Sequence, residues 1–302
     1  MNVKRFLEKY TSDLTGKKIA VTGSTGGLGV CLCDYLAGLG ASLILLDRNE
    51  SRSSAHRDRL IAKYGVDVSC FSLDLEDISA VDEAAVYLVE QNVDVFIHNA
   101  GAYAIPRHKT SCGYDNVFQI NFASPYYLIR RLLPHLRGRS GRVVVVGSIA
   151  HNYSHIDVSD IDFSRRSASS LVYGNSKRYL MYSLYELFRE EKCVPLSVTH
   201  PGITFTNITA HYPKLIYAII KHPMKVIFNK PKDAALSILL GVFESTEYKT
   251  WIGPRIFNIW GKPKKQKLNT SKTDEIAKIA DIAESVYIGC CAKAEESRSL
   301  KG

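Results

Sequence analysis

Short apolar segments alternate with longer amphipathic segments from residue 17 to about residue 254. The short segments are rich in Val, Ile and Leu without strict alternation of apolar and polar residues, which is typical of parallel strands buried on both faces. Strands are expected at 18–22, 41–46, 66–73, 93–98, 142–147 and 195–199, and a short segment at 250–252 could add an edge strand. Helices are expected between them, at 27–39, 53–64, 79–91, 114–136 and 171–191.

This alternation predicts an α/β fold with a Rossmann-type, doubly wound parallel sheet. A length of 302 residues alone would suggest about two domains. Because no Gly-, Pro- or Ser-rich linker interrupts the alternation, one domain is expected over residues 17–268, including an apolar substrate-lid segment at 205–230. Residues 1–16 are expected to form an N-terminal helical extension, and residues 269–302 a polar, partly helical C-terminal tail.

Composition and cysteine usage indicate a cytoplasmic protein. The apolar content of 46% is ample for a sizeable core. The sequence has neither the run of roughly 18 apolar residues expected of a transmembrane helix nor the apolar N-terminal stretch of a signal peptide. The seven cysteines form no CxxC pair or Cys/His cluster, so reduced thiols and no metal site are expected.

The net charge of +9 is unevenly distributed. Residues 212–232 contain five lysines and no acidic residue, and a second group follows at Lys262, Lys264, Lys265 and Lys267. No nucleic-acid-binding module accompanies them, so nucleic acid is not an expected partner. The charge indicates either an ordinary solvated basic face or a surface that attracts an anionic lipid or substrate. Interleaved apolar residues make peripheral membrane contact through 212–232 a further option.

A glycine-rich turn follows the first expected strand and precedes the first expected helix. Glycines let the backbone approach a pyrophosphate, and the helix that follows offers unpaired N–H groups. Strand, turn and helix together are the context that a dinucleotide-binding motif needs. The residues expected to line the cofactor here are Gly23, Ser24, Thr25, Gly27, Leu28 and Gly29.

The ends of the next strands carry further candidate cofactor residues. Asp47 is placed to accept from ribose hydroxyls, whereas Arg48 beside it would attract a 2′-phosphate; the position of Asp47 favours NAD over NADP. Asp74, followed by Leu75, could accept from an adenine amino group or could simply cap a turn. The small residues of Asn99-Ala100-Gly101 allow close packing against a ribose.

Tyr173 and Lys177 lie four residues apart, on one face of an expected helix. An ammonium beside a phenol should lower the pKa of the phenol toward the range useful for proton transfer. Ser148, at the end of the fifth strand, could stabilise the substrate oxygen, and Asn121 could hold a water next to Lys177. Taken singly, each could be an ordinary helix or turn residue; in this order and context they predict hydride-transfer chemistry.

Together these motifs resemble the short-chain dehydrogenase/reductase family over residues 17–254. The resemblance implies a catalytic tetrad of Asn121, Ser148, Tyr173 and Lys177. It also implies nicotinamide contacts in the segment that contains Pro201, Gly202, Ile203 and Thr206.

A closer resemblance is to the retinol dehydrogenase-like branch of that family. It is carried by Ser148-Ile-Ala-His151, Ile156 with Asp160-Ile161-Asp162-Phe163, Lys230-Pro231-Lys232-Asp233-Ala234-Ala235 and Ile252-Gly253-Pro254. The departures from that branch are His98, where Asn is commoner, Arg178, where an apolar residue is usual, and Asp47. They leave cofactor choice and substrate identity open.

The expected substrate is a bulky hydrophobic alcohol or ketone, steroid- or retinoid-like. The support is the apolar lid segment together with Tyr103, Ile105 and Tyr153, although the same residues could simply pack on the core. Ser148, Tyr153 and Tyr173 are the expected substrate contacts. A homodimer or homotetramer is expected from the resemblance. Alternative functions are a non-catalytic dinucleotide sensor or scaffold, which would need no Tyr/Lys pair, and an epimerase or dehydratase of the same family, for which the chain after Gly202 is short.

Overall fold

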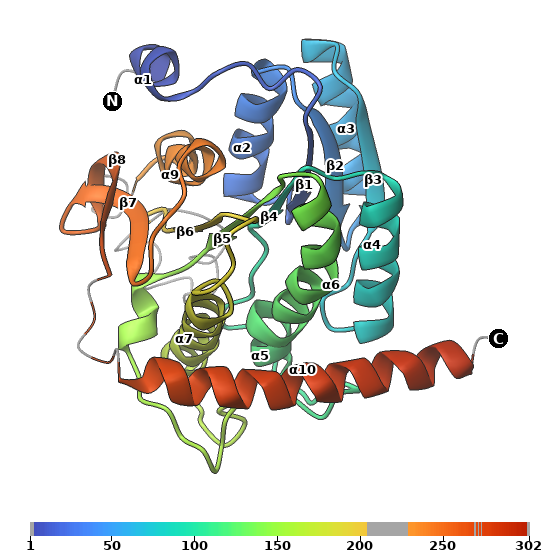
Figure 1. Ribbon diagram of the computed structural model, residues 1–302, viewed down its shortest axis with the longest axis vertical. Coiled ribbons are helices and arrows are strands. Elements are labelled where there is room, and N and C mark those ends of the chain that lie inside the picture. The colour runs from blue at the N-terminus through green and yellow to red at the C-terminus, as the bar shows by residue number, and fades with distance from the viewer. Residues whose placement is uncertain (1–2, 204–228, 269, 271, 273, 301–302) are drawn as a thin grey trace, which may run out of the picture.

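The computed structural model describes residues 3–203, 229–268, 270, 272 and 274–300. Its centre is an eight-stranded sheet with the order β3-β2-β1-β4-β5-β6-β7-β8 (Figure 1). All neighbouring strands are parallel except β7 and β8, which form an antiparallel hairpin at one edge. The predicted doubly wound parallel sheet is confirmed.

The strands are close to the apolar segments of the sequence. Their bounds are β1 (Lys18–Thr22), β2 (Ser42–Asp47), β3 (Val68–Ser72), β4 (Val95–His98), β5 (Arg142–Val146), β6 (Leu196–Thr199), β7 (Thr250–Ile256) and β8 (Trp260–Lys267). The sequence did not predict β8, because its lysines hide the strand pattern and read as a charged surface segment. Lysine and proline are common on edge strands, where they discourage pairing with other chains.

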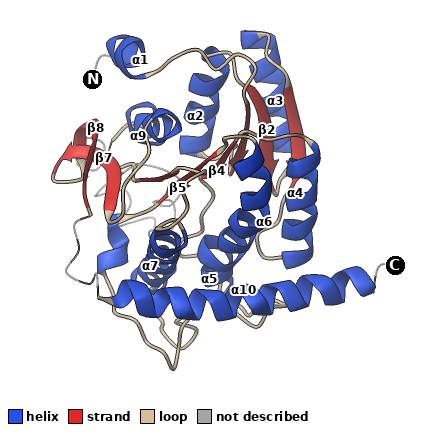
Figure 2. Ribbon diagram, in the orientation of Figure 1, coloured by secondary structure: helices blue, strands red, loops and turns tan. Residues whose placement is uncertain are grey.

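Helices cover both faces of the sheet (Figure 2). Their bounds are α1 (Val3–Tyr10), α2 (Gly27–Gly38), α3 (Glu50–Tyr64), α4 (Ile78–Glu90), α5 (Asn116–Phe118), the π-helix η1 (Gln119–Ala123), α6 (Ser124–Gly138), the 3₁₀-helix η2 (Ile149–Asn152), α7 (Ser169–Leu187), α9 (Pro231–Phe243) and α10 (Glu275–Ser299). The helix expected at 114–136 is thus a helical segment divided by a π-turn, and the lid segment at 205–230 lies almost entirely outside the described residues.

Alternating residues of each central strand point into two separate cores. On one face Ala20, Phe96 and Val143 pack against α4, α6, α7 and α10. On the other face Ile19 and Val144 pack against α1, α2, α3 and α9. Strands buried on both faces require apolar residues at every position, which is why the sequence shows continuous apolar runs.

The C-terminal segment contributes one long helix to the first of these cores. Residues 269–302 look like a polar tail in the sequence, yet within them α10 buries one narrow stripe: Glu275, Ile276, Ile279, Ala283, Val286, Cys290 and Ala294. Figure 1 shows α10 lying across the ends of α7 and α5 and reaching the side of α4. Because the stripe is narrow, it takes up few residues of each helical turn, and the mean composition of the segment remains polar.

Candidate active site

The glycine-rich turn between β1 and α2 is packed too tightly for side chains. Gly23 has φ of +65°, and a Cβ on it would lie 2.9 Å from the Cα of Ala100. A Cβ on Gly29 would lie 2.2 Å from the carbonyl oxygen of Gly23. The turn is therefore closed on itself and on the end of β4, and the N-terminus of α2 is left facing the space beyond the sheet edge, as a phosphate site requires.

Asp47, at the end of β2, holds this turn in place. Its Oδ1 accepts from the backbone N of Thr25 at 3.1 Å and from Thr25 Oγ1 at 2.9 Å, while Ser24 Oγ donates to Oδ2. The carboxylate is almost fully buried, with 6% of the residue exposed. Asp47 thus has a structural task in addition to the ribose contact expected of it.

Thr22 ties the ends of β1 and β4 together. Its Oγ1 accepts from the backbone N of Asn99 and of Ala100, at 3.1 and 3.0 Å. Because both lone pairs are used, the hydroxyl proton is directed to His98 Nδ1 at 3.1 Å. Burial, and secondarily the charge of Lys177, hold the pKa of His98 well below its ordinary value, so the imidazole is neutral. His98 therefore replaces the commoner Asn as an acceptor at this junction.

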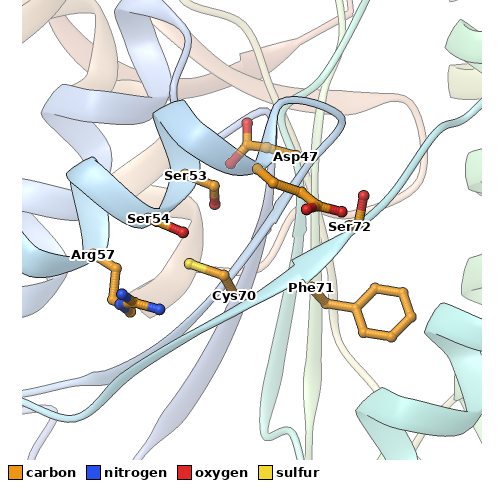
Figure 3. Close-up of a pocket in the computed structure, with 8 residues that line it drawn as sticks. Asp47, Ser53, Ser54, Arg57, Cys70, Phe71 and Ser72 are labelled. Carbon is orange, nitrogen blue, oxygen red and sulfur yellow. The ribbon is translucent and has the colours of Figure 1, made fainter.

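Basic side chains near Asp47 all have partners. Arg48 lies 3.7 Å from Glu76, Arg52 donates to the carbonyl oxygen of Thr25 at 3.0 Å, and Arg57 donates to Asp58 at 2.8 Å. A cavity of about 280 Å³ beside them runs between α3 and β3. Figure 3 shows its lining residues: Asp47, Glu50, Ser53, Ser54, Arg57, Cys70, Phe71 and Ser72. The carboxylates of Asp47 and Glu50, and an Arg57 guanidinium that is already paired, give this region little attraction for a 2′-phosphate.

The residues expected near the adenine serve the local fold. Asp74 Oδ1 accepts from the backbone N of Glu76 at 3.0 Å, which is the turn role that the sequence left open. Leu75 is 7% exposed, and its carbonyl oxygen accepts from Ser124 Oγ at 2.6 Å. Both follow β3 on the cofactor edge of the sheet, so a contact of Asp74 with adenine stays a prediction.

The structure brings Tyr173 and Ser148 into one site. Ser148 lies two residues after the end of β5 and caps η2, where its Oγ accepts from the backbone N of Ala150 at 3.2 Å. Burial raises the pKa of Tyr173 to about 12, and a hydrogen bond with Ser148 opposes part of that rise. Tyr103 packs edge-on against the Tyr173 ring, with the ring centroids 5.4 Å apart. Tyr173 therefore carries its proton at neutral pH.

Lys177 lies on the same face of α7, with its ammonium 5.9 Å from the centroid of the Tyr173 ring. It is 2% exposed and donates to the carbonyl oxygen of Val146 at 3.0 Å. Burial lowers its pKa to about 8. The expectation that Lys177 lowers the pKa of Tyr173 is not reflected here, because desolvation of the phenol is the larger effect.

Asn121 lies in the π-turn η1, a feature often found at functional sites. Its side chain pairs with both backbone groups of Ala102, at 2.8 and 2.9 Å, and donates to Ser176 Oγ at 3.0 Å. A Cβ on Gly101 would lie 3.1 Å from Asn121 Oδ1 and 3.5 Å from Lys177 Nζ. Asn121 and Lys177 thus converge on Gly101, and the tetrad is assembled in one place.

A second group of residues holds the Ser148 turn, and the sequence did not identify it as functional. His151 Nδ1 donates to the Ser148 carbonyl oxygen at 2.6 Å, and burial lowers the pKa of His151 to about 4. Arg178 donates to the His151 carbonyl oxygen at 3.0 and 2.6 Å and forms an ion pair with Glu275 at 3.3 Å. A Cβ on Gly174 would lie 2.3 Å from the Ala150 carbonyl oxygen, so only glycine lets α7 approach η2 this closely. The signals in the sequence were the unusual Arg178 and the Ser148-Ile-Ala-His151 motif.

The remaining predicted contacts are only partly described. The loop after β6 places Gly202 at φ of +78°, and Asn229 donates from its backbone N to the Ile203 carbonyl oxygen at 2.8 Å. Pro201 lies in the same loop, and Thr206 lies outside the described residues. Tyr153 is 53% exposed, and its contact with substrate stays a prediction.

The arrangement fits a nicotinamide dinucleotide and suits proton transfer to or from an oxygen. The closed glycine turn, the Thr22 junction and the Gly202 loop all lie at the carboxyl ends of parallel strands, where doubly wound sheets bind such ligands. When bound there, the dinucleotide would supply or accept a hydride. Tyr173 holds the proton, Ser148 offers a hydrogen bond to the oxygen, and Lys177 offers a nearby positive charge.

Comparisons with known proteins agree with this site. Residues 17–214 match the family model of the short chain dehydrogenases. Human retinol dehydrogenase 14 is 28% identical over 298 residues, which cover 91% of this chain and 87% of that protein. Human WW domain-containing oxidoreductase is 31% identical over 223 residues, covering 69% of this chain and 53% of that protein, so the chain spans about half the length of this relative.

Solved structures share the fold. An uncharacterised protein from Mycobacterium paratuberculosis superposes with a TM-score of 0.72 at 25% identity, over 94% of this chain and 95% of that chain. L-sorbose reductase from Gluconobacter frateurii, solved with NADPH and L-sorbose, has a TM-score of 0.61 at 19% identity, over 77% and 91% of the two chains. The resemblance to retinol dehydrogenase-like proteins is also confirmed. The chain belongs to the short-chain dehydrogenase/reductase family.

Proposed function

We propose that the protein uses NAD to interconvert a hydroxyl and a carbonyl group on a bulky hydrophobic substrate. The observation that carries the reaction type is the convergence of Tyr173, Ser148, Lys177 and Asn121 at the carboxyl edge of the sheet. In the reducing direction Tyr173 Oη would give its proton to the carbonyl oxygen, and a bound reduced dinucleotide would supply the hydride that the carbon requires. Ser148 holds that oxygen, and oxidation runs the same steps in reverse.

Support for NAD comes from the charges around the end of β2. Asp47 is a buried carboxylate at the position that would face the ribose 2′-hydroxyl. Arg48, which would attract a 2′-phosphate, is 3.7 Å from Glu76. The negative charge of Glu76 lowers the attraction of Arg48 for that phosphate. The balance of Asp47, Glu50 and Glu76 against partnered arginines favours a cofactor without that phosphate.

Support for a hydrophobic substrate comes from the surroundings of Tyr173. Tyr103 contacts its ring, and Tyr153 is half exposed beside it. Relatives include proteins named retinol dehydrogenase and polyprenol dehydrogenase, whose names indicate long apolar alcohols. A retinoid, steroid or polyprenol-like alcohol is therefore the substrate class to screen first.

The first test is to titrate the purified protein with NADH and with NADPH in separate experiments, and to monitor binding by nicotinamide fluorescence. Tighter binding of NADH is expected. Glu76→Gln should release Arg48 and shift the ratio of the two dissociation constants about fivefold toward NADPH. Glu90→Gln, at the far end of α4, is the matched control and should leave the ratio unchanged. Tighter NADPH binding by the unmodified protein would reject NAD as the cofactor.

The second test is Tyr173→Phe, which separates an enzyme from a dinucleotide sensor on the same fold. An enzyme should lose turnover of hydrophobic alcohols by about 10²-fold or more while keeping cofactor affinity. Turnover that survives Tyr173→Phe would contradict the assigned role. A protein that binds the dinucleotide but turns over no alcohol or ketone, before or after the substitution, would support the sensor or scaffold alternative.

A further inference from the structure

The β7–β8 hairpin exposes apolar side chains at its tip. Ile256 is 50% exposed, Phe257 81% and Trp260 37%. Ile256 pairs with Trp260 across the hairpin, and Phe257 lies in the turn between them, so all three residues lie at the tip. The hairpin is the edge of the sheet opposite β3 (Figure 1). Single exposed apolar residues are ordinary, whereas a group of large ones at a turn calls for an explanation.

The turn itself is conformationally unfavourable for its residues. Phe257 and Asn258 have φ of +50° and +58°, two successive residues in the left-handed region. Turns of this kind favour Asn and Gly, and a bulky aromatic residue is rare there. Phe257 gains little packing in return, because most of its surface is exposed. A strained and unpacked aromatic residue indicates a contact made outside the chain.

Positive charge extends along the hairpin, from Arg255 and Lys262 near the tip to Lys249 and Lys267 at its base. Residues 249–267 contain six basic residues and no acidic residue. Lys265 lies 3.8 Å from Glu247, but in the described part of the chain no ion pair engages Arg255, Lys262, Lys264 or Lys267. Lysines on an edge strand normally discourage strand pairing, and this explains the charge of β8. It does not explain the exposed apolar residues at the tip.

The tip is attached to the catalytic edge of the sheet. His200 Nε2 donates to the Asn258 carbonyl oxygen at 2.5 Å, and the Asn229 side chain donates to the Ile259 carbonyl oxygen. His200 directly precedes Pro201 and Gly202, the loop assigned to the nicotinamide. A partner bound at the tip would therefore lie next to the loop that contains Pro201 and Gly202.

We propose that the tip of the β7–β8 hairpin inserts into an anionic lipid membrane, so that substrate dissolved in the bilayer reaches the site directly. Apolar and aromatic side chains with lysines around them are typical of segments that lie in the membrane interface. A second copy of this chain is the less favourable occupant, because it would bring the same positive charges into the contact. The membrane contact stands independently of the proposed function; delivery of substrate rests on it.

The test is co-flotation of the full chain with vesicles of phosphatidylcholine and phosphatidylserine, compared with phosphatidylcholine alone. Binding is expected only to the anionic vesicles and should weaken as salt is raised. Phe257→Asn should reduce the affinity about tenfold, and it should fold well because Asn suits the turn. The combined change Lys262→Gln, Lys264→Gln and Lys267→Gln should reduce it by on the order of 100-fold.

Two control variants remove similar groups elsewhere. Val158→Ser removes an apolar side chain that is 74% exposed, and Lys278→Gln removes an exposed lysine of α10; neither should change vesicle binding. Failure of the unmodified protein to bind anionic vesicles would overturn the proposal. So would unchanged binding of the Phe257 and lysine variants, or conversion of a dimer to a monomer by Phe257→Asn in light scattering.

Turnover of a detergent-dispersed hydrophobic alcohol separates this proposal from the proposed function. Turnover without vesicle binding would refute the membrane contact and leave the enzymatic function intact. Vesicle binding without any turnover would refute the enzymatic function and leave the membrane contact intact. Phe257→Asn should keep its turnover in detergent and lose it selectively for alcohol supplied in anionic vesicles.

Discussion

At the scale of single residues, Lys177 is buried and Tyr173 is half-buried, and desolvation moves their pKa values in opposite directions. The pKa of Tyr173 rises to about 12 and that of Lys177 falls to about 8. At neutral pH the phenol is protonated and most of the lysine is still charged. The site thus holds an acid ready to donate, beside a cation that is kept in an unfavourable environment.

Lys177→Met should change how stability depends on pH. The unfolded chain releases the lysine proton near pH 10.4 and the folded chain near pH 8, so the unfolded state binds more protons between these values. Stability of the unmodified protein should therefore rise with pH across this window, by about 2 kcal/mol between pH 7 and 9.5. Lys177→Met should lack that gain and also lose turnover.

The measurement is urea unfolding of both proteins at several pH values. The comparison cancels the titration of the other groups, which the two proteins share. If both proteins show the same change in unfolding free energy between pH 7 and 9.5, Lys177 does not carry the destabilisation assigned to it.

Three members of the predicted tetrad have a signature in the sequence, namely the spacing of Tyr173 and Lys177 and the strand-end position of Ser148, and the family resemblance implied the tetrad as a whole. It could not predict that burial governs the pKa of Tyr173, since burial depends on what Tyr103 and the rest of the fold place around the ring. It also could not pair Arg178 with Glu275, because nothing near either residue in the chain points to the other.

At the scale of elements, the turn between β1 and α2 shows how backbone packing excludes side chains. Gly29→Ala would place a Cβ 2.2 Å from the Gly23 carbonyl oxygen and 2.8 Å from the Ser24 Cα, and neither backbone atom can move freely. The substitution should cost about 2 kcal/mol or more of stability and abolish cofactor binding.

Gly138→Ala is the matched control for this substitution. Gly138 ends α6, has no atom within 4 Å of its Cβ position, and should gain up to about 1 kcal/mol of stability when replaced by alanine. Thermal unfolding and NADH titration of both variants check the pair. Intact NADH binding by Gly29→Ala would show that the turn can open.

Arg178 on the catalytic helix α7 forms an ion pair with Glu275 on α10 and donates to the His151 carbonyl oxygen, in the turn that follows Ser148. The Arg178 side chain is fully buried and that of Glu275 is 9% exposed. Arg178→Met should destabilise the fold by about 3 kcal/mol, because it leaves the Glu275 carboxylate buried without its main partner. The double variant with Glu275→Met should cost less than the sum of the single variants by at least about 1 kcal/mol.

A double-mutant cycle on Lys293 and Glu296 is the control, because these residues form a solvent-accessible ion pair within α10 at 2.8 Å. Their coupling energy should be below about 0.5 kcal/mol. As a positioning residue for the turn that carries Ser148, Arg178 should affect kcat more than the affinity for NADH. A purely structural role would not affect kcat selectively. Additive single variants would contradict the coupling of α7 to α10.

At the scale of the whole molecule, α10 completes one of the two cores. Ile279 on α10 is fully buried, whereas Ile288 on the same helix is 60% exposed. Ile279→Ala should reduce the unfolding free energy by about 2–4 kcal/mol, and Ile288→Ala should change it by less than about 0.5 kcal/mol. Thermal unfolding should stay a single transition in both, because the helix is part of the same cooperative unit. A separate early transition in Ile279→Ala would mean that α10 docks independently.

The sequence predicted the sheet well because every central strand is buried on both faces and reads as an apolar run. The edge and the end of the chain were harder to predict for physical reasons. The lysines of β8 make an exposed edge strand resemble a loop, and the narrow buried stripe of α10 leaves the segment polar on average. In both places tertiary contact, and not local composition, determines the element.

The position of α10 in the chain has a consequence for synthesis. Translation delivers all eight strands and the helices α4, α6 and α7 before it delivers α10. Until then the apolar faces that receive Ile276, Ile279 and Ala283 are open to solvent, although the sheet beneath them can already be formed. Each newly made molecule therefore passes through a stage with an exposed apolar surface, in which it can be captured by chaperones or aggregate before its last helix closes the core.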